Sequence, residues 1–246
     1  MAGIREGGVS GVAGWPYVLL SVAASVDGYI DDASQQRLLL SDAADLDRVD
    51  EVRAGCDAIL VGAGTIRRDN PRLLVRSPSR RDARLARGLP PSPARVTLTR
   101  RGDLDPAARF FTDGGTARLV YAPADAAGQV RARLADAATV IDAGQQVTAA
   151  AVLADLARRG VRRLLVEGGA EVHALFLSAG AVDELQLAIA PFFVGDPAAP
   201  RFAAGGPFPQ DFAHPMKLAE VRPVGTVVLL RYLLGQRHDR DGQETP

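Results

Sequence analysis

Two stretches of the chain share a design that limits the folds open to it: an apolar strand, then glycines, then the start of a helix. The first is residues 59–65 (ILVGAGT) and the second is residues 164–170 (LLVEGGA). Glycine there lets a phosphate group approach the main chain, and the free N–H groups of the following helix bind its charge. Either stretch could be an ordinary strand-to-helix turn. Two of them at the carboxyl ends of strands, where open α/β sheets bind ligands, favour a phosphate-containing ligand.

Strand and helix patterns alternate along most of the chain. Short apolar runs typical of strands occupy residues 17–23, 57–61, 95–98, 118–121, 139–141, 162–166 and 184–190. Leu46, Val49 and Val52 recur every third residue and predict a helix with one apolar face, ended by Gly55. Further helices are expected over residues 147–159 and 170–179. Residues 77–93 are rich in Arg and Pro without a period, so we expect an irregular loop there.

The alternation predicts an α/β sandwich with a mostly parallel sheet. Residues 216–222 and 226–233 flank Pro223 and Gly225, which indicates a closing antiparallel hairpin and therefore a mixed sheet. We see no internal repeat and no domain break. We expect a single domain over residues 16–236, a flexible N-terminus over residues 1–15 and a flexible tail over residues 237–246.

Composition excludes several classes of function. The 29 basic and 29 acidic residues cancel, so no broad field should attract nucleic acid or a membrane surface. No apolar run approaches the roughly 18 residues of a membrane span, and no leader peptide is evident. The lone Cys56 excludes an internal disulfide and is expected to be a buried thiol, so we expect a cytoplasmic protein. His173, His214 and His238 lack metal-ligand spacing, and we expect no metal site and a structural role for His173.

Common nucleotide motifs do not fit the glycine segments. Arg67 stands where a dinucleotide fingerprint requires a third small residue, and neither segment has the Gly-Lys-Ser/Thr of a P-loop. Two carboxylates are candidate catalytic acids: Asp27, directly after the first strand, and Glu167, immediately before Gly168. Alternatively, Asp27 could cap its own Asp-Gly turn, and Glu167 could cap the next helix.

The order of several motifs resembles the reductase domain of riboflavin biosynthesis, which has a dihydrofolate-reductase-like fold. The matching segments are SVDG (25–28), VRA (52–54), AILVGAGTI (58–66), DNPRLLVR (69–76), VEGGA (166–170), GAVDEL (180–185) and IAP (189–191). The resemblance implies a three-layer sandwich and hydride transfer from NADPH to the ribose carbon of a ribosylaminouracil phosphate, a small phosphorylated heterocycle. It also implies a homodimer, which would cover the apolar strands expected near the end of the chain.

Position by position, the resemblance divides the site into a cofactor side and a substrate side. The cofactor side comprises Ala23, Gly62, Gly64, Thr65, Asp69, Gly168, Gly169, Ala170, Glu171 and Val172. Thr99 and Arg100 are candidates for binding the 2′-phosphate of NADPH. The substrate side comprises Arg37, Arg53, Leu73, Arg76 and Glu167, of which Arg53 and Arg76 suit a phosphate.

Three features depart from the family pattern. Ser21 stands where bifunctional members often have Lys, residues 37–39 (RLL) replace a Ser-x-Trp segment, and the zinc motif of the usual N-terminal deaminase is missing from the sequence. We therefore keep three hypotheses. The chain is a reductase of an aminouracil-type substrate, a reductase of another heterocycle such as dihydrofolate or a pterin, or a non-catalytic NADPH-binding protein.

Overall fold

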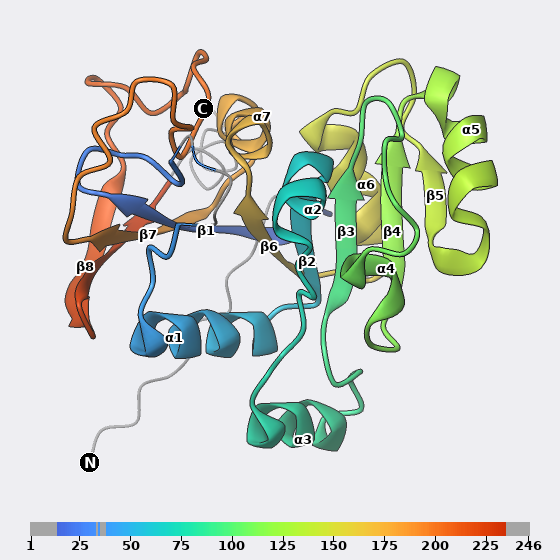
Figure 1. Cartoon of the computed structure of the whole chain (residues 1–246), viewed down its shortest axis with the longest axis horizontal. Coiled ribbons are helices and arrows are strands. Elements are labelled where there is room, and N and C mark those ends of the chain that lie inside the picture. Colours follow the sequence, from blue (N-terminus) through green and yellow to red (C-terminus); the bar gives the residue numbers. More distant parts are fainter. Residues whose placement is uncertain (1–13, 33, 35–37, 235–246) are drawn as a thin grey trace, which may run out of the picture.

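A computed structural model describes residues 14–32, 34 and 38–234. The expectations for residues 1–13, for the tail from residue 237 and for Arg37 lie outside the described residues. Within them, one sheet has the strand order β5-β4-β3-β2-β6-β1-β7-β9-β8 (Figure 1). Its parallel strands are β1 Tyr17–Ser25, β2 Ala58–Gly62, β3 Ala94–Leu98, β4 Arg118–Ala122, β5 Thr139–Asp142, β6 Arg163–Gly168 and β7 Glu184–Ala190.

The chain closes the sheet with a hairpin, as predicted. β8 (Lys217–Val224) and β9 (Val227–Leu233) pair antiparallel, and β9 pairs antiparallel with β7. Gly225 in the turn has φ +59°, and a Cβ atom there would collide with the carboxylate of Asp42. That carboxylate accepts the N–H of Thr226 at 2.6 Å. The mixed, mostly parallel sheet is therefore confirmed.

Helices cover both faces of the sheet and complete the predicted three layers (Figure 1). Their bounds are α1 Ala43–Ala54, α2 Ala63–Asp69, α3 Pro78–Ala86, α4 Arg109–Thr112, α5 Ala124–Leu134, α6 Ala149–Arg158 and α7 Ala170–Ser178, with a 3₁₀ turn at Ala135–Ala137. On one face, α6 and α7 pack Val152, Leu156 and Phe176 into an apolar core. On the other, α2, α4 and α5 form a second core, and α1 lies over β6, β1 and β7.

α1 forms where predicted, but its expected apolar face is only partly confirmed: Val52 packs against the second core, whereas the fully buried residues of the helix are charged. Leu46 is 36% exposed, whereas Asp45, Arg48 and Asp50 are buried. The physical reason is the sheet surface beneath the helix. The strands there present polar side chains, and the helix turns its charged residues toward them.

The loop expected over residues 77–93 was also wrong, because it contains α3. The Ser77 hydroxyl accepts the N–H of Arg80 and caps the helix, and Pro78 occupies the first turn. Arg84 is buried and donates to the carbonyls of Ala54 and Cys56 at 2.8 Å each. Arginine in this segment therefore fastens a helix to the end of α1.

Other expectations can be compared directly with the structure. Cys56 is 1% exposed, and burial raises the pKa of its thiol to about 11, which confirms a buried, protonated cysteine. Across the described residues, no helix is long and apolar enough to cross a membrane. The same residues contain no group of three or more His, Cys, Asp and Glu positioned to hold a metal ion.

Candidate functional site

The two glycine segments meet at the carboxyl edge of the sheet. Gly62 and Gly169 occupy the N-cap positions of α2 and α7, and no side chain caps either helix. A Cβ atom on Gly62 would lie 2.9 Å from Val172 Cγ2, so glycine is what lets the first turn of α7 pack against the end of β2. The Gly168–Gly169 peptide is cis. The structure thus brings together residues that the sequence separates by about a hundred positions.

The space between these helix starts suits a pyrophosphate. A Cβ atom on Gly169 would lie 3.4 Å from Thr65 Oγ1, so any larger residue would fill the gap between α7 and α2. The first turn of α7 offers uncapped N–H groups at Ala170 and Glu171, and α7 has nine residues. Gly64 is exposed at the start of α2, and Asp69 ends that helix. The N–H groups of Ala170 and Glu171 and the Thr65 hydroxyl could bind the phosphates of a nicotinamide dinucleotide.

Arg100 lies just beyond β3 and reaches the first turn of α7. Its Nη2 donates to Glu171 Oε2 at 2.8 Å, and the two side chains are 80% and 77% exposed. An exposed pair of this kind contributes little stability, so a phosphate can displace Glu171 from Arg100. Thr99 is different: it is buried, and its hydroxyl accepts the N–H of Gly102 at 2.9 Å. Of the two residues, Arg100 is the better placed for a 2′-phosphate.

His173 lies inside α7, against Gly168. Its ring is fully buried, Nδ1 hydrogen-bonds the carbonyl of Phe202, and Nε2 has no partner within the part of the chain described. Burial lowers the pKa of His173 to about 4, so the ring is neutral at physiological pH and donates from Nδ1. This geometry agrees with the structural role expected for it.

A second group of site residues lies on the sheet face beneath α1. The pairing of parallel strands places Ser21 of β1 beside Gln186 of β7, and Leu20 beside Val166. Glu167 of β6 therefore follows in the same row as Ser21 and on the same face. We call this face, carried by β6, β1 and β7 and covered by α1, the floor.

Glu167 and Arg53 form a two-pronged ion pair on the floor. Arg53 Nε and Nη2 donate to the two carboxylate oxygens of Glu167, each at 2.7 Å. The side chains are 18% and 12% exposed. Burial disfavours the charge on Arg53, but the adjacent carboxylate outweighs it and holds the pKa of Arg53 above its usual value. The two predicted substrate residues are thus brought together, with Arg53 occupied by Glu167.

This pairing decides what each group can do chemically. A carboxylate has about four acceptor positions, and Arg53 uses two, so Glu167 can still accept hydrogen bonds from substrate N–H groups. Arg53 fixes the orientation of that carboxylate, and its Nη1 donates to the carbonyl of Leu74 at 3.4 Å. The geometry favours Glu167 as an oriented acceptor over a proton donor.

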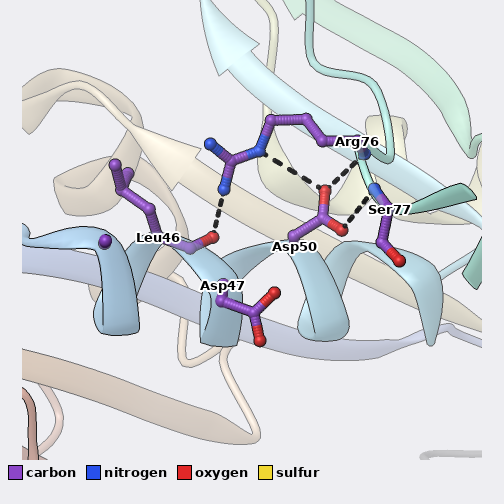
Figure 2. Close-up of a pocket in the computed structure, with 6 residues that line it drawn as sticks. Leu46, Asp47, Asp50, Arg76 and Ser77 are labelled. Atoms are coloured by element: carbon purple, nitrogen blue, oxygen red, sulfur yellow. Dashed lines mark hydrogen bonds and ion pairs between the residues drawn. The ribbon is translucent and has the colours of Figure 1, made fainter.

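Arg76 lies beside a hollow of about 400 Å³ between α1 and the start of α3 (Figure 2). The main-chain N–H groups of Arg76 and Ser77 donate to Asp50 at 2.5 and 3.1 Å. Burial of Asp50 works against its charge, but these N–H groups hold its pKa below the usual value. The Arg76 guanidinium donates to the carbonyl of Leu46, and its Nε lies 3.6 Å from Asp50 Oδ1 (Figure 2). The side chain is 54% exposed, so its other N–H groups are available for a phosphate. Leu73 is buried nearby in a left-handed conformation.

Asp27 is occupied by main-chain and hydroxyl donors. Its carboxylate accepts from Ser25 Oγ at 2.5 Å and from the N–H groups of Val194 and Gly195 at 3.1 and 2.8 Å. The Ser25 hydrogen bond is the main reason that the pKa of Asp27 is about 2. The side chain therefore ties the turn after β1 to the loop after β7, a structural role that differs from the expected cap of its own Asp-Gly turn. Ala23 of β1, four residues before Asp27, is partly exposed on the floor.

The sequence did not indicate the polar partners of α1 within the sheet. Arg48 Nη1 donates to Gln186 Oε1 at 2.6 Å, and Gln186 Nε2 donates to Glu184 Oε1 at 2.9 Å. The alternation of polar and apolar residues in β7 (ELQLAIA) was the available signal, because it gives one face of that strand polar side chains.

Comparison with known proteins places the chain among reductases. Residues 16–230 match the RibD C-terminal domain. A 2,5-diamino-6-ribosylamino-4(3H)-pyrimidinone 5′-phosphate reductase of Archaeoglobus fulgidus is 37% identical, over 85% of this chain and 94% of that protein. Riboflavin biosynthesis protein RibD of Bacillus amyloliquefaciens is 31% identical, over 93% of this chain and 60% of its own length. The structure of Acinetobacter baumannii RibD aligns with a TM-score of 0.73 at 27% identity, over 89% of this chain and 58% of that one.

The fold and these relatives define the class first: the chain is an oxidoreductase with a dihydrofolate-reductase-like fold. More narrowly, it belongs to the RibD C-terminal domain family, as its motifs indicated. It spans about 58% of the Acinetobacter RibD chain and nearly the whole length of the Archaeoglobus reductase.

Proposed function

We propose that this protein uses NADPH to reduce a ribosylaminopyrimidine 5′-phosphate. The observation that carries the proposal is the junction of β6 and α7. There Glu167, held by Arg53 on the floor, is followed at once by the uncapped glycine start of α7. One short segment therefore offers an acceptor for a heterocycle and donors for a pyrophosphate, which ties the position of the substrate to that of the cofactor.

The cofactor side uses the residues around the two glycine segments. The N–H groups of Ala170 and Glu171 and the Thr65 hydroxyl would bind the pyrophosphate, and Gly62 and Gly169 leave it room. Ala23 offers a small, partly exposed surface on the floor. When bound, the nicotinamide supplies the hydride. The choice of NADPH over NADH rests on Arg100, whose exposed guanidinium suits a 2′-phosphate.

The substrate side orients a phosphorylated heterocycle. Arg76 would bind the ribose phosphate, and Leu73 would contribute apolar contact from the same segment. Glu167 would accept ring or exocyclic N–H groups with the acceptor positions that Arg53 leaves open. Asp27 would act by fixing the loop at Val194 and Gly195.

Two pyrimidines are candidate substrates. The Archaeoglobus relative, whose length this chain nearly spans, is named for a 2,5-diaminopyrimidinone, whereas the sequence alone led us to a deaminated aminouracil. The test is NADPH oxidation by the purified protein with each pyrimidine and with dihydrofolate, the product being identified by mass spectrometry. We expect turnover of a pyrimidine. Turnover of dihydrofolate alone would support the other heterocycle hypothesis, and NADPH binding without any turnover would support a binding protein.

We also propose that the protein is a homodimer. Leu218, Val221 and Val228 are 51%, 56% and 44% exposed on the edge hairpin. The register places Val221 beside Leu230 and Val228 beside Pro223, so these apolar side chains share one face of β8 and β9. An uncovered apolar sheet edge invites aggregation, and a second copy would cover it. Light scattering should report the mass of two chains at micromolar concentration, and Val221→Glu should halve it. A monomeric unmodified protein would rule this out.

A further inference from the structure

Gln186 lies on the floor in one row with Ser21 and Glu167. The three residues come from neighbouring strands, β7, β1 and β6, and face α1. Adjacent strands are about 4.8 Å apart, so the main-chain positions of Gln186 and Glu167 are separated by roughly 10 Å. That distance is comparable to the width of a small heterocycle with its substituents. A ring that reaches Glu167 therefore lies within reach of Gln186.

Solvent reaches the floor at only a few of its described positions. On β7, the residues that face α1 are Glu184, Gln186, Ala188 and Ala190, and of these Gln186 alone is partly exposed. On β1 the partly exposed residue is Ala23. On β6 Glu167 is partly exposed, and Arg163, at the far end of that strand, is exposed. The three partly exposed side chains, Ala23, Gln186 and Glu167, thus lie on three adjacent strands. Two of them, Ala23 and Glu167, already belong to the cofactor and substrate sides.

The Gln186 amide is held in one orientation. Arg48 donates to its oxygen at 2.6 Å, and its nitrogen donates to Glu184 at 2.9 Å. Glu184 in turn accepts from Arg231 and from the hydroxyl of Tyr17, each at 2.7 Å. Burial opposes the charge on Glu184, but these donors hold its pKa below the usual value. If the amide oxygen and nitrogen were exchanged, the NH₂ group would face the Arg48 guanidinium and the oxygen would face the Glu184 carboxylate. A donor would then meet a donor and an acceptor would meet an acceptor.

The fixed amide retains unused hydrogen-bonding capacity. An amide side chain has two N–H donors and two acceptor positions, and the contacts described use one of each. A pyrimidine edge carries donors and acceptors side by side, which such an amide can match. Burying a network of charged groups costs free energy. Because this network fixes the orientation of a partly exposed amide, it points to a role for Gln186 in recognising a ligand.

We infer that Gln186 contacts the polar edge of the pyrimidine and determines which pyrimidine the enzyme prefers. The inference rests on the proposed function and adds a residue to its substrate side. Gln186 takes no part in hydride transfer. It fixes the position and identity of the ring, so its removal changes substrate binding and selectivity more than the rate of the bound complex.

The test is steady-state kinetics of Gln186→Met, which keeps the length of the side chain and removes its hydrogen bonds. Losing one or two neutral hydrogen bonds to substrate corresponds to about a 10-fold rise in KM. We expect kcat to change less than about 3-fold and the Kd of NADPH to stay the same. The ratio of kcat/KM for the 2-amino and 2-oxo pyrimidines should also shift by about 5-fold or more, because the amide distinguishes donors from acceptors.

The matched control is Tyr17→Phe. It removes a buried hydrogen bond from Glu184 in the same network and leaves the Gln186 side chain itself unchanged. We expect a lower melting temperature and an unchanged KM. A KM within 2-fold of the unmodified protein in Gln186→Met, or an equal rise in Tyr17→Phe, would overturn the inference and leave the proposed function intact. Absence of turnover of any pyrimidine by the unmodified protein would overturn both.

Discussion

Replacing Glu167 by Gln separates the stabilising role of this carboxylate in its ion pair from the substrate role that we propose for it. Both oxygens accept from Arg53 at 2.7 Å. A glutamine oxygen can replace one acceptor, but its NH₂ group then faces a guanidinium N–H. Breaking a fully buried ion pair costs about 3–5 kcal/mol. Because the two side chains are 18% and 12% exposed, we expect a smaller loss in the free energy of unfolding, about 2–3 kcal/mol. For a domain of this size, the melting temperature should fall by about 5–10 °C.

The same change should also lower turnover. Glu167→Gln removes the negative charge that attracts substrate N–H groups, and we expect turnover to fall by roughly 10- to 150-fold, the scale for losing a hydrogen bond to a charged acceptor. NADPH binding should be nearly unchanged, because the cofactor contacts that we propose are main-chain groups of α7. Thermal unfolding, NADPH titration by fluorescence and steady-state kinetics well below the melting temperature measure the three quantities separately.

Glu220→Gln is the matched control, since Glu220 pairs with Arg222 at 2.6 Å on the exposed edge hairpin. We expect its melting temperature to change by less than about 2 °C and its turnover to stay normal. Normal turnover in a destabilised Glu167→Gln would refute the substrate role. Normal stability and normal turnover together would show that the Arg53–Glu167 pair neither stabilises the fold nor contributes to turnover.

Three further predictions follow from the site. Arg100→Gln should weaken NADPH binding by roughly 10- to 150-fold and leave NADH unchanged in the same titration; equal losses would contradict a 2′-phosphate contact. Asp27→Asn should mainly lower the melting temperature, because it weakens the ties to Val194 and Gly195; a stable but inactive variant would exchange the roles of Asp27 and Glu167. Burial lowers the pKa of His173 to about 4, below its unfolded value of about 6.5, so the unfolded chain takes up a proton first as the pH falls. Denaturant melts should therefore show about 2 kcal/mol less stability at pH 5 than at pH 7 from this group, a loss absent in His173→Asn; equal losses in both proteins would contradict it.

Local sequence patterns predicted the buried parallel strands and the closing hairpin. Buried parallel strands such as β2 and β6 read as short apolar runs, and the hairpin follows from Pro223 and Gly225. α3 was missed, although Ser77 followed by proline is a helix-start signal that could have found it. Its high Arg and Pro content concealed it.

Features that depend on distant parts of the chain were not predictable in the same way. The sequence gives no sign that Arg53 pairs with Glu167, 114 residues away, and it indicated separate roles for them. The apolar spacing of α1 did not indicate its buried charged residues for the same reason, since their partners lie on strands much later in the chain. The glycine segments could be recognised because their function depends on local backbone geometry.

Because the side of α1 that faces the sheet is mainly polar, separating this helix from the sheet costs less free energy than unfolding the apolar cores. The helix is attached to the sheet through Arg48 and Arg53, and its contact with the apolar cores is limited to Val52, which is only partly buried. Separation of α1 from the sheet therefore exposes mainly charged groups, which water solvates well. Local opening at α1 should consequently require far less free energy than global unfolding. Added salt weakens these attachments and leaves the cores intact. Substrate access to the floor should consequently respond to ionic strength, a dependence that an apolar helix-to-sheet contact would not have.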